Sequence, residues 1–384
     1  MKAAVLGYGT VGAGVYSMLS DAPGMEAGPV LVRPGKAVES FMVSDAALIF
    51  GDPTVDAVVE TLGGLDPAYS YGMRALEAGK HFITANKAMV ASHGLELAAL
   101  AREKGAAFLF SAACGGGVPF LHNLALSAET DRIEAVSGIL NGTTNYMLDA
   151  MQRRSLSYGD ALREAQSLGY AESDPTADVS GLDALRKMQL ACAVAFGVLP
   201  QSGMLCEGME HFTAADVEDI QSRGLVCRLM ARGSRAGESV SAYVEPVLFP
   251  RAAPESSVFT NNNMARYTGT RCGSIVLMGQ GAGRFPTASA VLRDLAAAQQ
   301  GARSMFPENC RAAEADNREA VHSYYIRTGG FAAVRLPLRS VLAQGEVVRA
   351  VTEPMSAEKM HALAQNIRKD GNDLFFAALE EELC

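Results

Sequence analysis

Short apolar runs alternate with helical periods through the first third of the chain. Strands that alternate with helices across short, glycine-closed connections predict a parallel, doubly wound α/β sheet. Apolar runs lie at residues 2–6, 30–33, 56–61, 81–86 and 107–110, and helical periods at 11–19, 71–78 and 95–104. Because ligands of such sheets bind at the carboxyl ends of the strands, we expect a site beside Gly63, Lys87 and the glycines at 115–117.

After residue 131 the pattern is mixed, and the strands become more antiparallel in character. Strands are expected at 132–139, 243–249, 257–265, 274–278, 323–327, 347–352 and 374–379, and helices at 146–151, 158–168, 177–196 and 357–367. Pro286 can begin one further helix. The predicted fold class is therefore α/β, with a doubly wound N-terminal domain at 1–131 followed by a mixed region.

Composition narrows the class of protein. The 384 residues are 49% hydrophobic and 20% charged, which suits a folded chain of two to three domains. A net charge of −9 disfavours nucleic-acid and anionic-membrane partners. No apolar stretch approaches the roughly 18–20 residues that cross a bilayer. Seven scattered cysteines predict reduced thiols and a cytoplasmic location.

A G-x-G-x-x-G motif, Gly7 to Gly12, directly follows the first predicted strand and opens a helix. In this context Gly7 permits a tight turn, Gly9 admits a pyrophosphate to the backbone, and Gly12 allows the helix to pack on the strand. Free N–H groups at the helix start then face the phosphates. The motif predicts dinucleotide binding; the alternative is a glycine-rich turn that binds nothing.

The second apolar run ends at Arg33, and Lys36 follows closely. Sites that prefer NAD usually hold Asp or Glu at this position, where the carboxylate binds the ribose hydroxyls. A cation instead suits the 2′-phosphate of NADPH, so NADP(H) is favoured and NAD(H) is the alternative. Arg33 as a solvated loop charge is the other interpretation.

A dense charged cluster lies at the head of the helix predicted at 177–196. Asp183 and Lys187 are four residues apart, so they share one helix face. A solvated, salt-bridged face is one interpretation. Since the rest of this helix is almost wholly apolar, the charges need partners, and a ligand is the favoured one. The cluster comprises Glu172, Asp174, Asp178, Asp183, Arg186 and Lys187.

Together these motifs resemble the homoserine dehydrogenase family over roughly residues 1–300. The matching segments are 7–12, 60–64, 84–87, 141–146, 169–187 and 281–291, of which GYAESDPTADVSGLDALRK at 169–187 is the specific one. The resemblance implies a Rossmann-type NAD(P)-binding domain at 1–131 and a mixed α/β catalytic and dimerisation domain at 132–300. Helix 286–300 would return toward the first domain, and 321–384 resembles a shortened ACT regulatory domain.

The resemblance also implies the reaction: reversible NAD(P)H-dependent reduction of L-aspartate 4-semialdehyde to L-homoserine, within threonine and methionine biosynthesis. Lys187 is then the proton donor to the aldehyde oxygen, and Asp183 binds and orients beside it. Glu172 and Asp178 would hold the substrate ammonium, and Lys87 would lie between nicotinamide and substrate. A Lys side chain with an ordinary pKa of about 10.4 is protonated at neutral pH.

Cofactor contacts are expected from the glycine motif, the end of the second apolar run and the strand ends, at Gly7, Gly9, Thr10, Gly12, Arg33 and Gly63, and the resemblance adds Val11, Lys87, Gly169 and Gly283. A sodium site would use the backbone carbonyls of Cys114, Gly116 and Val118, although Ser111 replaces the family's usual Glu. The expected partners are a small-molecule substrate, a second subunit in a homodimer or homotetramer, and threonine as feedback effector.

Two other readings of the chain are open. A related two-domain reductase for another small amino or oxo acid would have a different pocket around Lys187. A nucleotide-binding sensor on the same scaffold would have no evident use for the carboxylates together with that lysine.

Overall fold

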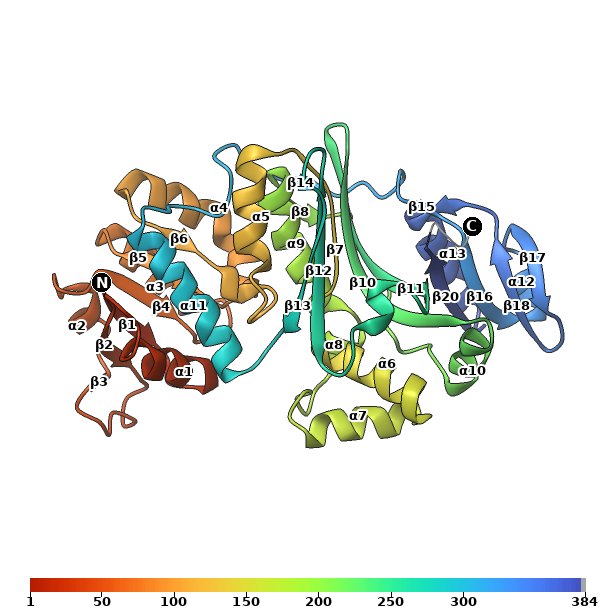
Figure 1. Ribbon diagram of the computed structural model, residues 1–384, viewed down its shortest axis with the longest axis horizontal. Helices are drawn as coiled ribbons and strands as arrows, with labels where there is room; N and C mark the ends of the chain where they lie inside the picture. Colours follow the sequence, from red (N-terminus) through yellow and green to blue (C-terminus); the bar gives the residue numbers. More distant parts are fainter. Residues whose placement is uncertain (381–384) are drawn as a thin grey trace.

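Two large sheets organise the computed structural model, which describes residues 1–380 apart from the side chains of Ala236 and Phe331 (Figure 1). The first sheet is wholly parallel, with the order β3-β2-β1-β4-β5-β6. Its elements are β1 (Lys2–Leu6), α1 (Thr10–Leu19), β2 (Glu26–Leu31), β3 (Met42–Val43), α2 (Ala47–Phe50), β4 (Ala57–Glu60), α3 (Ala68–Glu77), β5 (His81–Thr84), α4 (Lys87–Lys104) and β6 (Phe108–Leu109).

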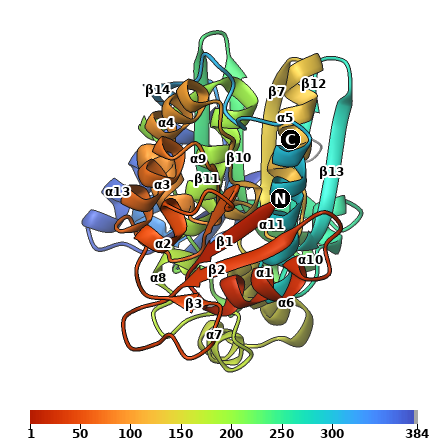
Figure 2. The same cartoon turned by 90° about the vertical axis from the view of Figure 1, so that its left-hand side faces the viewer.

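Helices cover both faces of this sheet. Figure 2 shows α3 and α4 on one side of the strands, and α1 with α11 (Arg284–Gln299) on the other. Strand β1 is accordingly apolar on both faces, and Ala3 to Leu6 are fully buried. The helix expected at 286–300 is present but begins two residues earlier, at Arg284, and it packs on the first unit, where a Cβ on Gly14 would lie 3.3 Å from the Ala288 side chain.

The second sheet is mixed, with the order β13-β12-β7-β10-β11-β20-β16-β18-β17, and β9 pairs with β11. Helix α9 (Leu182–Phe196) lies between this sheet and helices α4 and α5, which explains why its residues from Met188 onward are buried. The elements up to α11 are α5 (Phe120–Thr130), β7 (Ile133–Ile139), α6 (Gly142–Arg154), α7 (Tyr158–Ser167), α8 (Thr176–Val179), α9, β8 (Val198–Ser202), β9 (Leu205–Cys206), α10 (Ala214–Ser222), β10 (Leu225–Ala236), β11 (Ser239–Pro250), β12 (Asn262–Gly269) and β13 (Gly273–Gln280).

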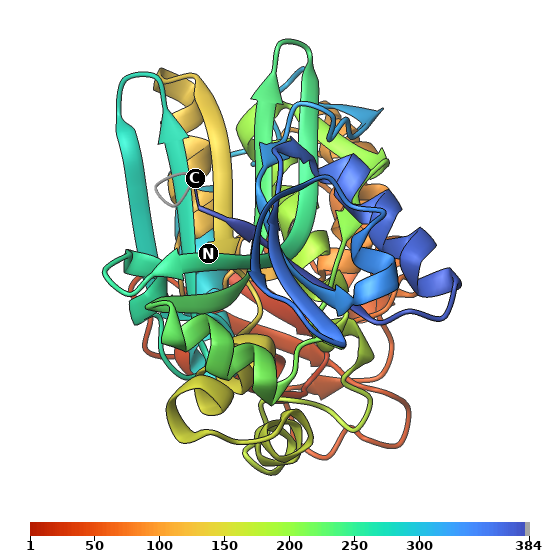
Figure 3. The same ribbon diagram turned by 90° about the vertical axis from the view of Figure 1, so that its right-hand side faces the viewer.

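Four C-terminal strands, β16, β17, β18 and β20, extend the same sheet, whereas β14 pairs with β8 and β15 pairs with β19 in separate two-stranded sheets (Figure 3). Strand β20 pairs in parallel with β11, joining Val247 to Ala378. From β16 to β20 the main elements follow the order β-α-β-β-α-β, with the strand order β20-β16-β18-β17 of ferredoxin-like folds. The elements after α11 are β14 (Arg311–Glu314), β15 (Val321–His322), β16 (Tyr324–Gly329), α12 (Gly330–Ala333), β17 (Leu338–Ala343), β18 (Val347–Thr352), β19 (Met355–Ser356), α13 (Ala357–Lys369) and β20 (Leu374–Leu379).

Two expectations about elements were wrong. The single helix predicted at 177–196 is two helices, because Gly181 adopts a left-handed φ of +83° between α8 and α9. The strand predicted at 257–265 begins only at Asn262, since a 3₁₀ turn occupies 254–257. Several elements were not predicted at all, namely α2, α5, α10, α12, β3, β8, β9, β10, β14, β15, β17 and β19. Among residues 1–380, no helix combines the length and the hydropathy of a membrane-spanning segment.

Candidate active site

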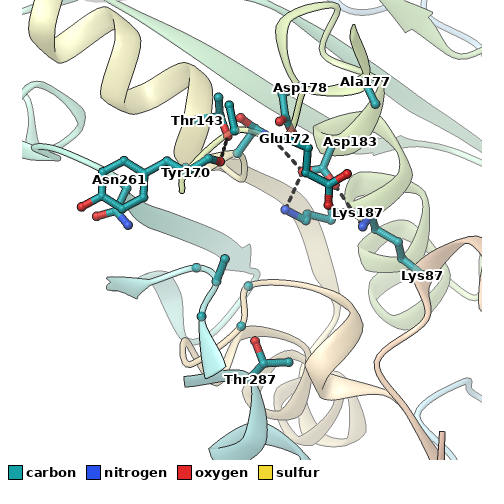
Figure 4. Close-up of a pocket in the computed structure, with 18 of the residues that line it drawn as sticks. Lys87, Thr143, Tyr170, Glu172, Ala177, Asp178, Asp183, Lys187, Asn261 and Thr287 are labelled. Carbon is teal, nitrogen blue, oxygen red and sulfur yellow. Dashed lines mark hydrogen bonds and ion pairs between the residues drawn. The ribbon is translucent and has the colours of Figure 1, made fainter. Parts of the chain in front are cut away.

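A cavity of about 670 Å³ lies between the two sheets, within the range of small-ligand sites. Its walls come from the starts of α4, α6 and α11, the loop before α5, the α7–α8 loop, and α9 (Figure 4). Nine of the predicted site residues line it: Val11, Lys87, Gly116, Gly169, Glu172, Asp178, Asp183, Lys187 and Gly283.

Lys187 faces the cavity and is held by two acceptors. Its Nζ donates to Asp183 Oδ2 and to the Leu140 carbonyl oxygen, both at 2.6 Å. The side chains of Lys187 and Asp183 are each 12% exposed, so the interpretation of this helix face as solvated is wrong. Burial alone would lower the pKa of Lys187, but the Asp183 carboxylate outweighs it and raises this pKa above its usual value.

Asp183 receives three polar contacts from three different elements. Lys187 donates from α9, Lys87 Nζ lies 3.2 Å from Oδ1, and Asn141 Nδ2 donates to Oδ2 at 2.9 Å. Burial alone would raise the pKa of Asp183, but the two ammonium groups outweigh it and hold the pKa well below its usual value. Asp183 is therefore an anion that favours the charged form of Lys187 and forms an ion pair with Lys87.

Asn141 joins the two central carboxylates, a role that the sequence analysis missed. Its Nδ2 donates to Asp178 Oδ1 at 2.7 Å as well as to Asp183, while its Oδ1 accepts from Thr144 N and caps α6. The signal in the sequence was a cap-type residue, which predicted the helix start only. Burial is the main cause that raises the pKa of Asp178. A positively charged ligand group would stabilise this half-buried carboxylate.

Glu172 lies on the exposed loop between α7 and α8. Figure 4 shows it on the same side of the cavity as Asp178 and Asp183, with Thr287 across from them. Gln166 donates to the Glu172 carbonyl oxygen at 3.1 Å, and Thr143 donates to Tyr170 O at 2.5 Å. These contacts tie the loop to α6 and α7 beside the cavity.

Lys87 is the first residue of α4, where the helix dipole disfavours a cation. Its ion pair with Asp183 offsets this unfavourable interaction with the helix dipole. The neighbouring loop is shaped by Glu60, which is fully buried and accepts from Leu62 N at 2.6 Å and from Thr84 Oγ1 at 2.5 Å. Gly63 on this loop has φ +77° and lies outside the cavity lining.

The glycine motif has the geometry that a pyrophosphate needs. A Cβ on Gly12 would lie 2.1 Å from Gly7 O, so the helix and the turn approach as only glycine allows. A Cβ on Gly9 would meet nothing within 4 Å, which leaves open space at the start of α1. Thr10 begins α1, and no side-chain hydrogen bond caps this start among the described residues. Backbone N–H groups there fit a dinucleotide phosphate.

Arg33 lies two residues beyond the end of β2 and is exposed, as is Lys36. Both lie outside the cavity lining. The end of β2 itself is Leu31, so the strand terminus carries no carboxylate.

Cys114 is fully buried, and burial raises the pKa of its thiol to about 12, which makes it a poor nucleophile. Ser111, nearby, donates its backbone N–H to Asp294 Oδ2 at 2.8 Å and its hydroxyl to the other oxygen. Of the three positions predicted to bind a cation, Gly116 lines the cavity, and Cys114 and Val118 do not. The described residues contain no cluster of His, Cys, Asp and Glu suited to a metal ion, so a cation here would depend on backbone carbonyls.

Comparison of the sequence and of the fold with known proteins points to one family. A family model described as "Homoserine dehydrogenase" matches residues 119–296, and one described as "Homoserine dehydrogenase, NAD binding domain" matches residues 7–111. A homoserine dehydrogenase of Corynebacterium glutamicum is 38% identical over 316 residues, covering 77% of this chain and 71% of the relative. One from Synechocystis sp. is 37% identical over 319 residues, covering 77% and 72%. A solved homoserine dehydrogenase from Thiobacillus denitrificans has a TM-score of 0.88 at 28% identity, covering 99% and 98% of the two chains.

Proposed function

The chain belongs to the homoserine dehydrogenase family of NAD(P)-dependent oxidoreductases, and from this premise we propose the roles of individual residues in its cavity. The reaction is the reversible reduction of L-aspartate 4-semialdehyde to L-homoserine. One observation carries the assignment of roles: the buried Lys187 ammonium lines the cavity, with Asp183 as its charged partner.

Lys187 is the proton donor. When bound, the nicotinamide supplies the hydride to the aldehyde carbon and accepts it back in the reverse direction. As negative charge builds on the aldehyde oxygen, the Lys187 ammonium stabilises that charge and transfers its proton. Asp183 keeps the lysine protonated and oriented between turnovers, and Lys87 adds a second positive charge beside it. In the oxidation of homoserine, neutral Lys187 takes the hydroxyl proton.

Asp178 and Glu172 hold the ammonium end of the substrate. Both line the same side of the cavity, and the raised pKa of the half-buried Asp178 indicates a carboxylate that gains from a cation. An Asp178→Asn substitution is expected to raise KM for L-homoserine while leaving KM for NADP⁺ unchanged.

NADP(H) is the favoured cofactor, with NAD(H) as the alternative. The exposed Arg33 and Lys36 beyond β2 support a 2′-phosphate, and Leu31 at the strand end offers no carboxylate to ribose hydroxyls. Val11, Gly169 and Gly283 would contact the cofactor where they line the cavity. An Arg33→Ala substitution is expected to lower kcat/KM for NADP⁺ and leave the value for NAD⁺ unchanged.

A sodium ion bound by the carbonyls of Cys114, Gly116 and Val118 is proposed for the loop before α5. The loop is held by Gly117 N, which donates to Gln280 O at 3.0 Å. Because Ser111 supplies no carboxylate, affinity would be low; activity that does not change between sodium and a large organic cation would contradict the site.

The C-terminal residues 321–384 form, on this proposal, a shortened ACT-like regulatory unit, of which 381–384 lie outside the described residues. The β-α-β-β-α-β order from β16 to β20 supports it, and its first helix, α12, is reduced to one turn. Threonine is the proposed effector of this cytoplasmic enzyme. Unchanged activity across millimolar threonine would remove that role.

The proposed domain boundaries are 1–131 and 132–300, the second domain being the one that dimerises. Strand β13 supports dimerisation, because it lies at the edge of the mixed sheet and exposes Val276 and Met278. A homotetramer would require a second interface.

The central experiment compares wild type with Lys187→Ala, with L-homoserine and each nicotinamide cofactor, by following the absorbance of the reduced nicotinamide. Loss of a general acid–base group typically lowers the rate about 10²- to 10⁴-fold. Cofactor binding, measured by fluorescence titration, should be retained. A Lys187→Ala enzyme with near-wild-type kcat would overturn the assignment.

A further inference from the structure

The acidic wall of the cavity depends on a tight turn between α8 and α9. Asp178 lies on α8 and Asp183 in the first turn of α9, with Gly181 between them in the left-handed region. A Cβ on Gly181 would lie 3.0 Å from Cys206 Sγ. The turn is therefore packed closely against residues 205–209, which we call the support segment.

The support segment binds this turn through polar contacts as well as packing. Met209 N donates to Val179 O at 2.9 Å, and the Cys206 thiol donates to Ser180 O at 3.0 Å. A Cβ on Gly208 would lie 2.2 Å from Val179 O, closer than real atoms approach. A displacement of the support segment must therefore move the turn.

Helix α13 holds the support segment from the other side. Glu207 accepts two hydrogen bonds from the Arg368 guanidinium, at 2.9 Å from Nη1 and 2.6 Å from Nη2. The Glu207 side chain is 9% exposed and that of Arg368 21%. Arg368 also donates to Leu374 O at the start of β20. A bidentate pair of this kind fixes orientation as well as distance.

From these contacts we propose that Arg368 and Glu207 are positioning residues for the reaction. They hold the support segment against the α8–α9 turn and so set the placement of Asp178, whereas Asp183 is held separately by Lys187, Lys87 and Asn141. The cavity lining within the described chain ends at Thr287, so Arg368 acts on the cavity only through other residues. The proposal rests on the substrate-binding roles proposed above, and it makes the C-terminal unit part of the active-site scaffold.

An Arg368→Gln substitution tests the proposal. Substitutions along a coupling path typically change affinity severalfold, so KM for L-homoserine should rise about 3- to 30-fold. Both kcat and KM for NADP⁺ should stay within about twofold of wild type, as for a loss of substrate binding alone. Arg368→Lys keeps the charge without the planar fork and should give an intermediate KM. The matched control is Arg335→Gln, which removes the exposed Arg335–Asp370 pair of the same unit and should change nothing.

Hydrogen exchange provides a readout that is independent of turnover. Arg368→Gln should speed amide exchange at residues 179–185 relative to Arg335→Gln, with strands β4 and β5 unchanged. A folded Arg368→Gln enzyme with unchanged KM and unchanged exchange would overturn the proposal. If Arg368→Gln does not fold, Arg368→Lys takes its place, and KM for L-homoserine and amide exchange at residues 179–185 are measured on that variant.

Asp178→Asn separates the two proposals. If it leaves KM for L-homoserine unchanged while Arg368→Gln still speeds exchange at 179–185, the positioning contact stands and the substrate-binding assignment fails. If Asp178→Asn raises KM and Arg368→Gln affects neither readout, the assignment stands and the positioning role is wrong.

Discussion

The Lys187 ammonium experiences two opposing influences on its pKa. Burial disfavours its charged form, and the carboxylate 2.6 Å away favours it more strongly, so the group is charged at neutral pH. This suits reduction of the aldehyde, which consumes a proton at this position. It also sets a condition on the reverse reaction, which needs the same lysine without its proton.

We therefore predict that homoserine oxidation becomes faster as pH rises. The neutral form of Lys187 increases toward its raised pKa, above the ordinary value of about 10.4. The logarithm of kcat/KM for oxidation should climb from neutral pH to about pH 10 without a plateau. Initial rates in a constant-ionic-strength buffer series measure this, and a maximum below neutrality would contradict the role of Lys187.

In Asp294 the effect of burial on the pKa outweighs that of the neighbouring polar groups. It is fully buried on α11 with Ser111 as its hydrogen-bonding partner, and burial raises its pKa to about 7. An acid with a raised folded-state pKa binds its proton more tightly in the folded protein. Its contribution to stability is therefore present at low pH and is lost as pH rises from about 4 to about 7.

Asp294→Asn should remove this dependence, since an amide can still accept from Ser111 N and donate to its hydroxyl. Relative to wild type, the variant should gain about 2–4 kcal/mol of unfolding free energy at pH 8 and little at pH 4. Urea unfolding at both pH values measures the difference. An equal change at the two values would contradict the raised pKa.

At the scale of elements, the break between α8 and α9 changes how Asp178 and Asp183 lie relative to each other. A continuous helix over 177–196 would place Asp178 and Asp183 five residues apart, on different faces. The left-handed Gly181 instead lets both accept from the same Asn141 amide. The turn at Gly181 thereby brings two carboxylates that would lie on different helix faces into one site.

We predict that Gly181→Ala lowers kcat/KM for L-homoserine at least tenfold. A β-carbon both strains φ at +83° and approaches Cys206 Sγ to 3.0 Å, so the turn must shift. Gly371→Ala is the matched control, because Gly371 has φ +80° with open space around it. The control should cost about 1 kcal/mol of stability and leave kinetics unchanged. If both substitutions lowered kcat/KM equally, backbone strain would explain the loss of activity, and displacement of the α8–α9 turn would not.

At the scale of the whole molecule, the second sheet runs from β13 at one edge to β17 at the other. Its two edges differ in their surroundings. Strand β13 adjoins the catalytic half and exposes Met278 (59%) and Val276 (42%) on one face, since residues two apart point the same way. Strand β17 belongs to the C-terminal unit and exposes Val341.

If subunits associate through the β13 edge, Met278→Asp should convert dimers to monomers, because a charge would be buried in the interface. Val341→Asp, at the opposite edge, is the control and should leave the oligomeric state unchanged. Light scattering coupled to size-exclusion chromatography gives the mass of each. A wild type that is monomeric, or dimers that persist in Met278→Asp, would contradict this interface.

Features that depend on residues close together in the sequence were predicted correctly, and features that depend on distant residues were missed. The strand–turn–helix at residues 2–19 and the pairing of Asp183 with Lys187 were correct, because each depends on neighbours within one or two turns. The break at Gly181 was missed because the apolar period runs through it unchanged. Strand β10 was missed as well, and its observed place depends on pairing with β7 and β11.

The sequence by itself determined the alternating α/β pattern, the open glycine turn and the charge pairing at the head of α9, since local spacing encodes all three. Tertiary structure alone decided that Asn141, Lys87 and the Leu140 carbonyl meet Asp183 and Lys187 around one cavity. It also decided that Arg368 supports that cavity from the far end of the chain. Contacts between residues more than 40 positions apart depend on how sheets and helices pack, and no local pattern in the sequence records that packing.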